Sequence, residues 1–113
     1  MAKFQVFKSA TFLKTEKRLA KRYPSVSGDV EHFLSVVESP ENLGIPLGKN
    51  IFKARIANKD AKRGKSGGYR LLSYLRLEEG RLILLYLYSK TDLANVTEEE
   101  LDRIVLDAVP EES

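Results

Sequence analysis

Four basic residues on three expected strands are the side chains best placed for chemistry. Residues 51–57 alternate between polar and apolar, which places Lys53 and Arg55 on one face of a strand, and Arg70 and Lys90 belong to the next two expected strands. Cations at such neighbouring, cleft-facing positions are costly unless an anion binds there. Together they could bind a phosphodiester and stabilise the extra negative charge of a pentacoordinate transition state. The pattern predicts a phosphate-binding site made of lysines and arginines.

A glycine-rich basic segment, residues 63–70, precedes the second of these strands and contains the tripeptide Gly-Lys-Ser. A nucleotide-binding P-loop is rejected, because Lys59 stands where its first glycine is required and a strand, not a helix, is expected to follow. The glycines still allow the backbone close to a ligand, with Lys65 and Arg70 available for phosphate contacts. A flexible basic connection without any ligand is the alternative that composition leaves open.

The sequence lacks the residues that other hydrolytic mechanisms require. The single histidine, His32, lies opposite the apolar stripe of its expected helix, and the chain has no cysteine, so a metal cluster, a thiolate nucleophile and a serine triad are all unsupported. The acidic residues gather in the C-terminal segment and near Glu38 and Glu41, as expected of a solvated surface. We expect no metal site and no cofactor.

The distribution of charge indicates a polyanionic ligand. The formal net charge is +3, but residues 49–76 hold nine basic residues and one acid, whereas residues 98–112 hold seven acids and one base. A basic middle beside an acidic tail suggests a surface for nucleic acid, with binding that weakens in salt, and a merely solvated charged surface is the alternative. Four tyrosines on the same strands could stack on bases, although each taken singly is better explained as core or sheet surface: Tyr69, Tyr74, Tyr86 and Tyr88.

The N-terminal half is expected to supply a strand and a helical hairpin. Residues 3–8 alternate as a strand does, and residues 11–23 form a basic amphipathic pattern that ends at Pro24. Ser27 can cap a second helix, whose apolar residues recur at helical spacing up to Val37.

The C-terminal half is expected to form three antiparallel strands and a short helix. Residues 42–50 read as a loop, and the strands cover residues 51–57, 69–77 and 81–90. The last strand is apolar at almost every position, so we expect it at the centre of the sheet. Thr97 with Glu100 forms a capping box ahead of an amphipathic C-terminal helix.

These elements predict an α+β fold with a mainly antiparallel sheet, an N-terminal helical hairpin and a short C-terminal helix. With 113 residues and 42% hydrophobic content, we expect one domain over residues 1–113. No apolar run approaches the roughly 18 residues that span a membrane, and the first residues lack a signal-peptide pattern, so a soluble cytoplasmic protein is expected.

The order of motifs resembles the RelE/HigB group of the RelE/ParE superfamily, toxins of type II toxin–antitoxin systems, in the branch with a Gly-Lys-Ser-Gly-Gly-x-Arg signature. The resemblance spans nearly the whole chain. The matching segments are Lys-Arg-Tyr-Pro at 21–24, Phe-Lys-Ala-Arg-Ile at 52–56, the signature at 64–70, Leu-Tyr-Ser-Lys at 87–90 and Asn-Val-Thr at 95–97. The resemblance implies a microbial ribonuclease fold with a partly curled antiparallel sheet.

The resemblance also implies an activity: a metal-independent endoribonuclease, or mRNA interferase, that inhibits translation by cutting messenger RNA in the ribosomal decoding site. The ribose 2′-hydroxyl attacks the adjacent phosphate and leaves a 2′,3′-cyclic phosphate and a 5′-hydroxyl. The implied roles are deprotonation of the 2′-hydroxyl by Lys53, binding of the scissile phosphate by Arg55 and Arg70, assistance to the leaving oxygen by Lys90, and RNA binding by Lys65, Arg63 and Tyr88.

Two consequences of this assignment concern Lys53 and Tyr88. A lysine that acts as a base needs a lowered pKa, which the neighbouring cations Arg55 and Arg70 would favour. Well-known family members carry a tyrosine in the C-terminal segment, whereas nothing after Tyr88 is aromatic in this chain, so Tyr88 is the candidate to replace it. Since the ribosome would supply the orientation of the reacting groups that the protein lacks, we expect feeble cutting of free RNA.

The implied partners are a cognate antitoxin protein, messenger RNA and the ribosome with its 16S rRNA, and no membrane. Two other functions stay open. The chain could inhibit a target such as DNA gyrase by binding, as the related ParE group does, or it could be a simple RNA-binding module. Retention of all four cations argues against the gyrase binder, and absence of new 5′-hydroxyl ends would identify the binding module.

Overall fold

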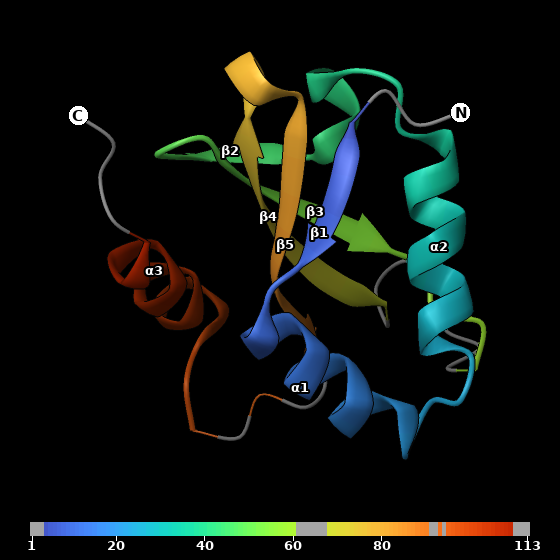
Figure 1. Cartoon of the computed structure of the whole chain (residues 1–113). Helices are drawn as coiled ribbons and strands as arrows, with labels where there is room; N and C mark the ends of the chain where they lie inside the picture. The colour runs from blue at the N-terminus through green and yellow to red at the C-terminus, as the bar shows by residue number, and fades with distance from the viewer. Residues whose placement is uncertain (1–3, 61–67, 91–92, 94, 110–113) are drawn as a thin grey trace.

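The computed structural model describes residues 4–60, 68–90, 93 and 95–109, and shows a twisted sheet with helices on both sides (Figure 1). The expected α+β class, the N-terminal helical hairpin and the C-terminal helix are confirmed. In chain order the elements are β1 (Gln5–Lys8), α1 (Ala10–Ala20), α2 (Val26–Val36), the 3₁₀ turn η1 (Pro40–Leu43), β2 (Ile45–Gly48), β3 (Ile51–Ile56), β4 (Tyr69–Arg76), the 3₁₀ turn η3 (Leu77–Glu79), β5 (Arg81–Ser89) and α3 (Glu98–Ala108).

The sheet is mixed and has the strand order β1-β5-β4-β3-β2. Strands β2 to β5 pair antiparallel, whereas β1 pairs parallel with β5, from Gln5 beside Arg81 to Lys8 beside Leu84. The strand at 81–90, expected at the centre of the sheet, is an interior strand between β1 and β4, one place from the middle. Because β1 and β2 extend the sheet at opposite edges, β4 is the middle strand, and seven of its eight residues are buried.

The expected loop at 42–50 was also wrong in part, because residues 45–48 form the edge strand β2. Lys49 and Asn50 connect β2 to β3, and these two residues have positive φ. Gly48 at the end of β2 lies opposite Ile51 at the start of β3. A two-residue turn with this backbone matches the twist of paired strands and closes a tight hairpin. The hairpin fixes the start of β3, two residues before Lys53.

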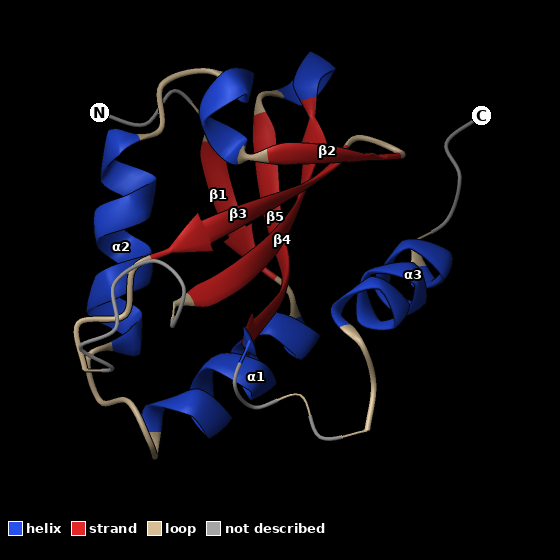
Figure 2. Ribbon diagram, turned by 180° about the vertical axis from the view of Figure 1, so that it is seen from behind, coloured by secondary structure: helices blue, strands red, loops and turns tan. Residues whose placement is uncertain are grey.

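Two apolar clusters hold the layers together. The larger lies between the sheet and the pair α1 and α2, and includes Phe12, Val30, Leu71 and Leu84, each at most 1% exposed. The smaller lies on the opposite face, under α3, where Leu101 and Val105 pack with Leu72 and Tyr88. Figure 2 shows α3 across the sheet from α2. The face beneath α3 is the one that carries the basic residues.

A buried carboxylate fastens the start of α2 to the chain that follows β3. Asp29, 3% exposed, accepts hydrogen bonds from Ser25 Oγ at 3.1 Å and from the backbone N–H of Lys59 at 3.2 Å. Replacing Asp29 by alanine leaves these donors unsatisfied, so we expect a loss of about 1–3 kcal/mol in the free energy of unfolding, measured in urea. Glu31→Ala removes an exposed acid of the same helix and should cost less than about 0.5 kcal/mol. Equal losses in the two variants would contradict the role of Asp29.

Candidate nucleic-acid site

Three of the candidate residues form one row across the sheet. Arg55 pairs with Arg70, and Arg70 pairs with Tyr88, in the antiparallel register of β3, β4 and β5. Directly paired residues of antiparallel strands project from the same face, and Lys53 shares that face two residues before Arg55. The sheet therefore brings three cations and a phenol to one face, where the Arg55 side chain is exposed. Lys53, Arg70 and Tyr88 contact carboxylates of α3.

Lys53 is held between two carboxylates of α3. Its Nζ lies 2.8 Å from Glu98 Oε2 and 2.6 Å from Asp102 Oδ2, and the side chain is 16% exposed. Burial alone would lower the pKa of Lys53, but the hydrogen bonds and charges of Asp102 and Glu98 outweigh burial and raise it above its usual value. The expectation of a lowered pKa was wrong, because acids rather than cations surround the amine.

Arg70 is enclosed, with a residue exposure of 2%. Its Nη1 donates weak hydrogen bonds, each 3.4 Å long, to the carbonyl oxygens of Gly68 and Tyr69. Its Nε forms an ion pair with Glu98 Oε2 at 3.4 Å. Among the residues that the structure describes, Nε makes no hydrogen bond. The Nε of this buried guanidinium is thus close to the Glu98 carboxylate without a hydrogen bond to it.

Tyr88 completes the row and is tied to the same helix. Its hydroxyl donates a hydrogen bond to Asp102 Oδ1 at 3.2 Å, and the residue is 6% exposed. Burial, and then the negative charges of Asp102 and Glu98, raise the pKa of Tyr88 above its usual value. These surroundings favour the protonated hydroxyl, which donates to Asp102.

Glu98 is the acid that contacts both Lys53 and Arg70. Burial raises the pKa of Glu98, but the hydrogen bond and charge of Lys53, and then the charge of Arg70, outweigh burial and hold it below the usual value. Glu98 and Asp102 were expected on a solvated surface, and that expectation was wrong. Their spacing of four residues, beside the apolar Leu101 and Val105, was the available signal, since i and i+4 share one helix face.

A groove of about 570 Å³ continues from this face between α1 and the start of α3. Beyond Leu84, β5 has no neighbour in β1, and α1 covers that edge, with Thr15 Oγ1 accepting a hydrogen bond from the Leu87 N–H at 3.3 Å. Arg18 and Arg22 line the groove together with Tyr88. Its cationic wall extends the basic surface toward α1.

The remaining predicted site residues lie apart from this enclosed group. Arg55 and Lys90 are exposed, at the end of β3 and just after β5. Lys65 and Arg63 lie outside the described residues. Within the described ranges, no three His, Cys, Asp or Glu side chains are grouped as a metal site would require, and no helix is long and apolar enough to cross a membrane.

Comparison with known proteins decides the family. The family model described as the RelE toxin of the RelE/RelB toxin–antitoxin system matches residues 4–108. The chain belongs to the RelE toxin family. Comparison with curated proteins gave no sequence match.

The fold of this RelE-family chain agrees with a solved structure. Eight chains of solved structures match, among them a double arginine-to-alanine mutant of the Escherichia coli toxin RelE in the free state. That structure has a TM-score of 0.57 and 15% identity, and the match covers 96% of this chain and 100% of the other. Membership of the RelE family also implies an antitoxin partner. The assignment to the HigB branch stays a prediction.

Proposed function

We propose that this protein is the toxin of a toxin–antitoxin pair and cleaves messenger RNA on the ribosome. The observation that carries the proposal is the row Arg55–Arg70–Tyr88 with Lys53 beside it, because it gathers phosphate-binding donors on one face of a rigid sheet. In the proposed reaction the 2′-oxygen bonds to the adjacent phosphorus and the bond to the 5′-oxygen breaks. The products are a 2′,3′-cyclic phosphate and a 5′-hydroxyl.

The proposed roles are those that the family resemblance implies for these residues. Arg70 and Arg55 bind the non-bridging phosphate oxygens and stabilise the charge that grows on them. Lys53 lies on the same face and takes the proton of the 2′-hydroxyl, while Lys90 assists the leaving 5′-oxygen. Lys65 and Arg63 bind flanking RNA, and Tyr88 contacts the substrate from the same row as Arg70.

The charge state of Lys53 sets a condition on this reaction. An ammonium group cannot accept a proton, and Glu98 and Asp102 stabilise the ammonium form. Lys53 can serve as a base only after it separates from the two carboxylates, when the phosphate-bound cations Arg55 and Arg70 become its nearest charges. The state described here is therefore a resting state of the site.

Mapping of 5′ ends on a defined messenger RNA tests the proposal. We expect new 5′-hydroxyl ends at decoding-site positions when programmed ribosomes are present, and few or none with free RNA, because the ribosome orients the substrate. Cuts of equal number and position without ribosomes would contradict the ribosome requirement. Absence of cuts from a folded protein that still stops growth would favour inhibition by binding.

A further inference from the structure

The groove between α1 and the start of α3 has an apolar interior. Its volume of about 570 Å³ lies within the range of roughly 300–1,000 Å³ that is usual for pockets that take small organic groups. Aliphatic side chains from α1, β5 and the segment before α3 line it: Leu19, Leu87, Leu93 and Val96. Val96 is 37% exposed, so part of this apolar surface is in contact with solvent. The groove therefore favours a ligand with an apolar body.

Two tyrosines of β5 give the groove an aromatic wall. Tyr86 and Tyr88 both line it, with ring centroids 6.3 Å apart and ring planes at 50° to each other. Tyr88 is almost enclosed and donates to Asp102, whereas Tyr86 is only half-buried. A base of single-stranded RNA can stack on an aromatic ring of this kind, whichever base it is, because every base has a π-face.

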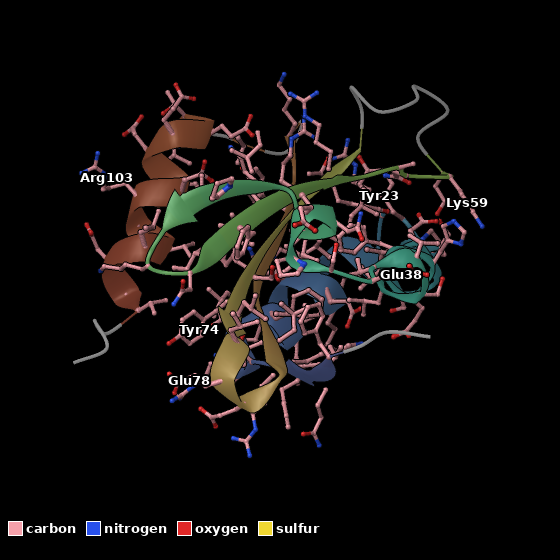
Figure 3. All side chains as sticks on the ribbon, turned by 90° about the horizontal axis from the view of Figure 1, so that it is seen from above. Tyr23, Glu38, Lys59, Tyr74, Glu78 and Arg103 are labelled. Carbon is pink, nitrogen blue, oxygen red and sulfur yellow. The ribbon has the colours of Figure 1, made fainter. Side chains whose placement is uncertain are left out.

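The charged residues that line the groove, within the described part of the chain, are Arg18 and Arg22. Arg18 lies in the last turn of α1, and Arg22 follows the C-cap residue Lys21. Both arginines are exposed, and Arg22 Cζ lies 5.5 Å from the centroid of the Tyr23 ring. The one base of α3, Arg103, is directed away from the sheet (Figure 3). The positive charge at the groove therefore comes from the end of α1.

The groove is continuous with the proposed phosphate site. Tyr88 lines the groove and is also the last member of the row that begins at Arg55 and passes through Arg70. A single RNA strand with a phosphate at this row therefore has a neighbouring nucleotide within reach of the groove. An acidic peptide could also pair with two arginines, but a nucleotide matches both the aromatic wall and the cations, since its base is flat and its phosphates are anionic.

We propose that the groove is a subsite for one nucleotide of single-stranded RNA beside the scissile position. The base stacks on Tyr86, and Arg18 and Arg22 bind the phosphates that flank it. The subsite rests on the proposed function, because the row that contains Arg70 is taken as the position of the scissile phosphate. Stacking and phosphate contacts add affinity and fix the register of the strand, and they do not select a particular base.

Two double variants with equal charge changes test the role of the arginines. R18Q/R22Q removes the cations of the groove, and K17Q/K21Q removes two exposed cations from the same end of α1 that do not line it. The probe is a fluorescent single-stranded oligouridine RNA with 2′-O-methyl groups, which cannot be cut, and binding is followed by anisotropy at low salt. We expect R18Q/R22Q to bind about ten to a hundred times more weakly than wild type. The loss for K17Q/K21Q should stay below about threefold.

The role of Tyr86 is tested by pairing a protein variant with a change in the RNA. Tyr86→Leu keeps an apolar side chain but removes the ring, and the second probe is the same oligomer without bases. We expect Tyr86→Leu to weaken binding of the normal probe by about 5–50-fold and of the abasic probe by less than about twofold. Phe7→Leu, which removes a 37% exposed ring of β1 that does not line the groove, should change neither affinity. Equal losses on both probes would show that Tyr86 is merely structural and would overturn base stacking.

The arginine variants keep the test valid if Tyr86→Leu fails to fold, because Arg18 and Arg22 are exposed, and thermal melting checks each variant. Equal affinities of R18Q/R22Q and K17Q/K21Q would overturn the subsite, as would absence of RNA binding by the wild-type protein. Since the probes cannot be cut, these results are separate from the nuclease test. Ribosome-dependent cutting by a wild-type protein whose RNA affinity is unchanged in R18Q/R22Q would retain the proposed function and remove the subsite.

Discussion

Replacing Arg70 by alanine is expected to lower the rate of ribosome-dependent messenger RNA cutting by about 10²–10³-fold, because one preorganised charged donor to the transition state is lost. Arg70 lies in the middle of the row, between Arg55 and Tyr88, and is the most enclosed of the proposed phosphate-binding groups. A donor in such a dry position contributes more than one in water. The rate of appearance of 5′-hydroxyl ends on programmed ribosomes measures the loss.

The stability of the Arg70 variant must be measured beside its activity, because the residue is buried. Thermal melting decides whether Arg70→Ala is folded, and Arg70→Lys, which retains the charge but not the planar fork, should cut at an intermediate rate. Arg81→Ala is the matched control, since it removes an arginine from the opposite end of the sheet. The Arg81 side chain is 48% exposed. Wild-type cutting by a folded Arg70→Ala protein would remove Arg70 from the site.

Gly44→Ala is expected to lower the free energy of unfolding by about 3 kcal/mol or more, from backbone strain and overlap together. Gly44 has φ +110°, which a residue with a Cβ adopts only under strain. A Cβ there would also overlap the carbonyl group of Lys53 and crowd Ala54 Cα. Because both neighbours are backbone of β3, relief requires a shift of the strand that carries Lys53.

The matched control for this substitution is Gly28→Ala in α2. An added Cβ at Gly28 meets nothing within 4 Å, and alanine is the better helix former, so a gain of up to about 1 kcal/mol is expected. Urea denaturation of the two variants should shift the midpoints in opposite directions. A midpoint for Gly44→Ala at or above that of wild type would show that β3 accommodates the methyl group freely.

Local patterns in the sequence predicted most of the elements and part of the site. Alternation over 51–57 placed Lys53 and Arg55 on one face, and the capping box at Thr97 and Glu100 marked the start of α3, which the structure confirms. These features depend on residues at most four apart, so they can be recognised without a fold. The family resemblance was confirmed by the family match over residues 4–108.

Tertiary structure decided how the site is presented. The parallel pairing of β1 with β5 and the position of β4 at the centre depend on strands that are distant in sequence. The contacts of Lys53 with Glu98 and Asp102 join residues 45 and 49 positions apart, and composition alone favoured a solvated surface for both acids. The sequence by itself determined which residues carry charge and which strand face they share. Only packing of α3 on the sheet decided that Lys53 and Arg70 lie against carboxylates, because a charge is neutralised by what lies next to it in space.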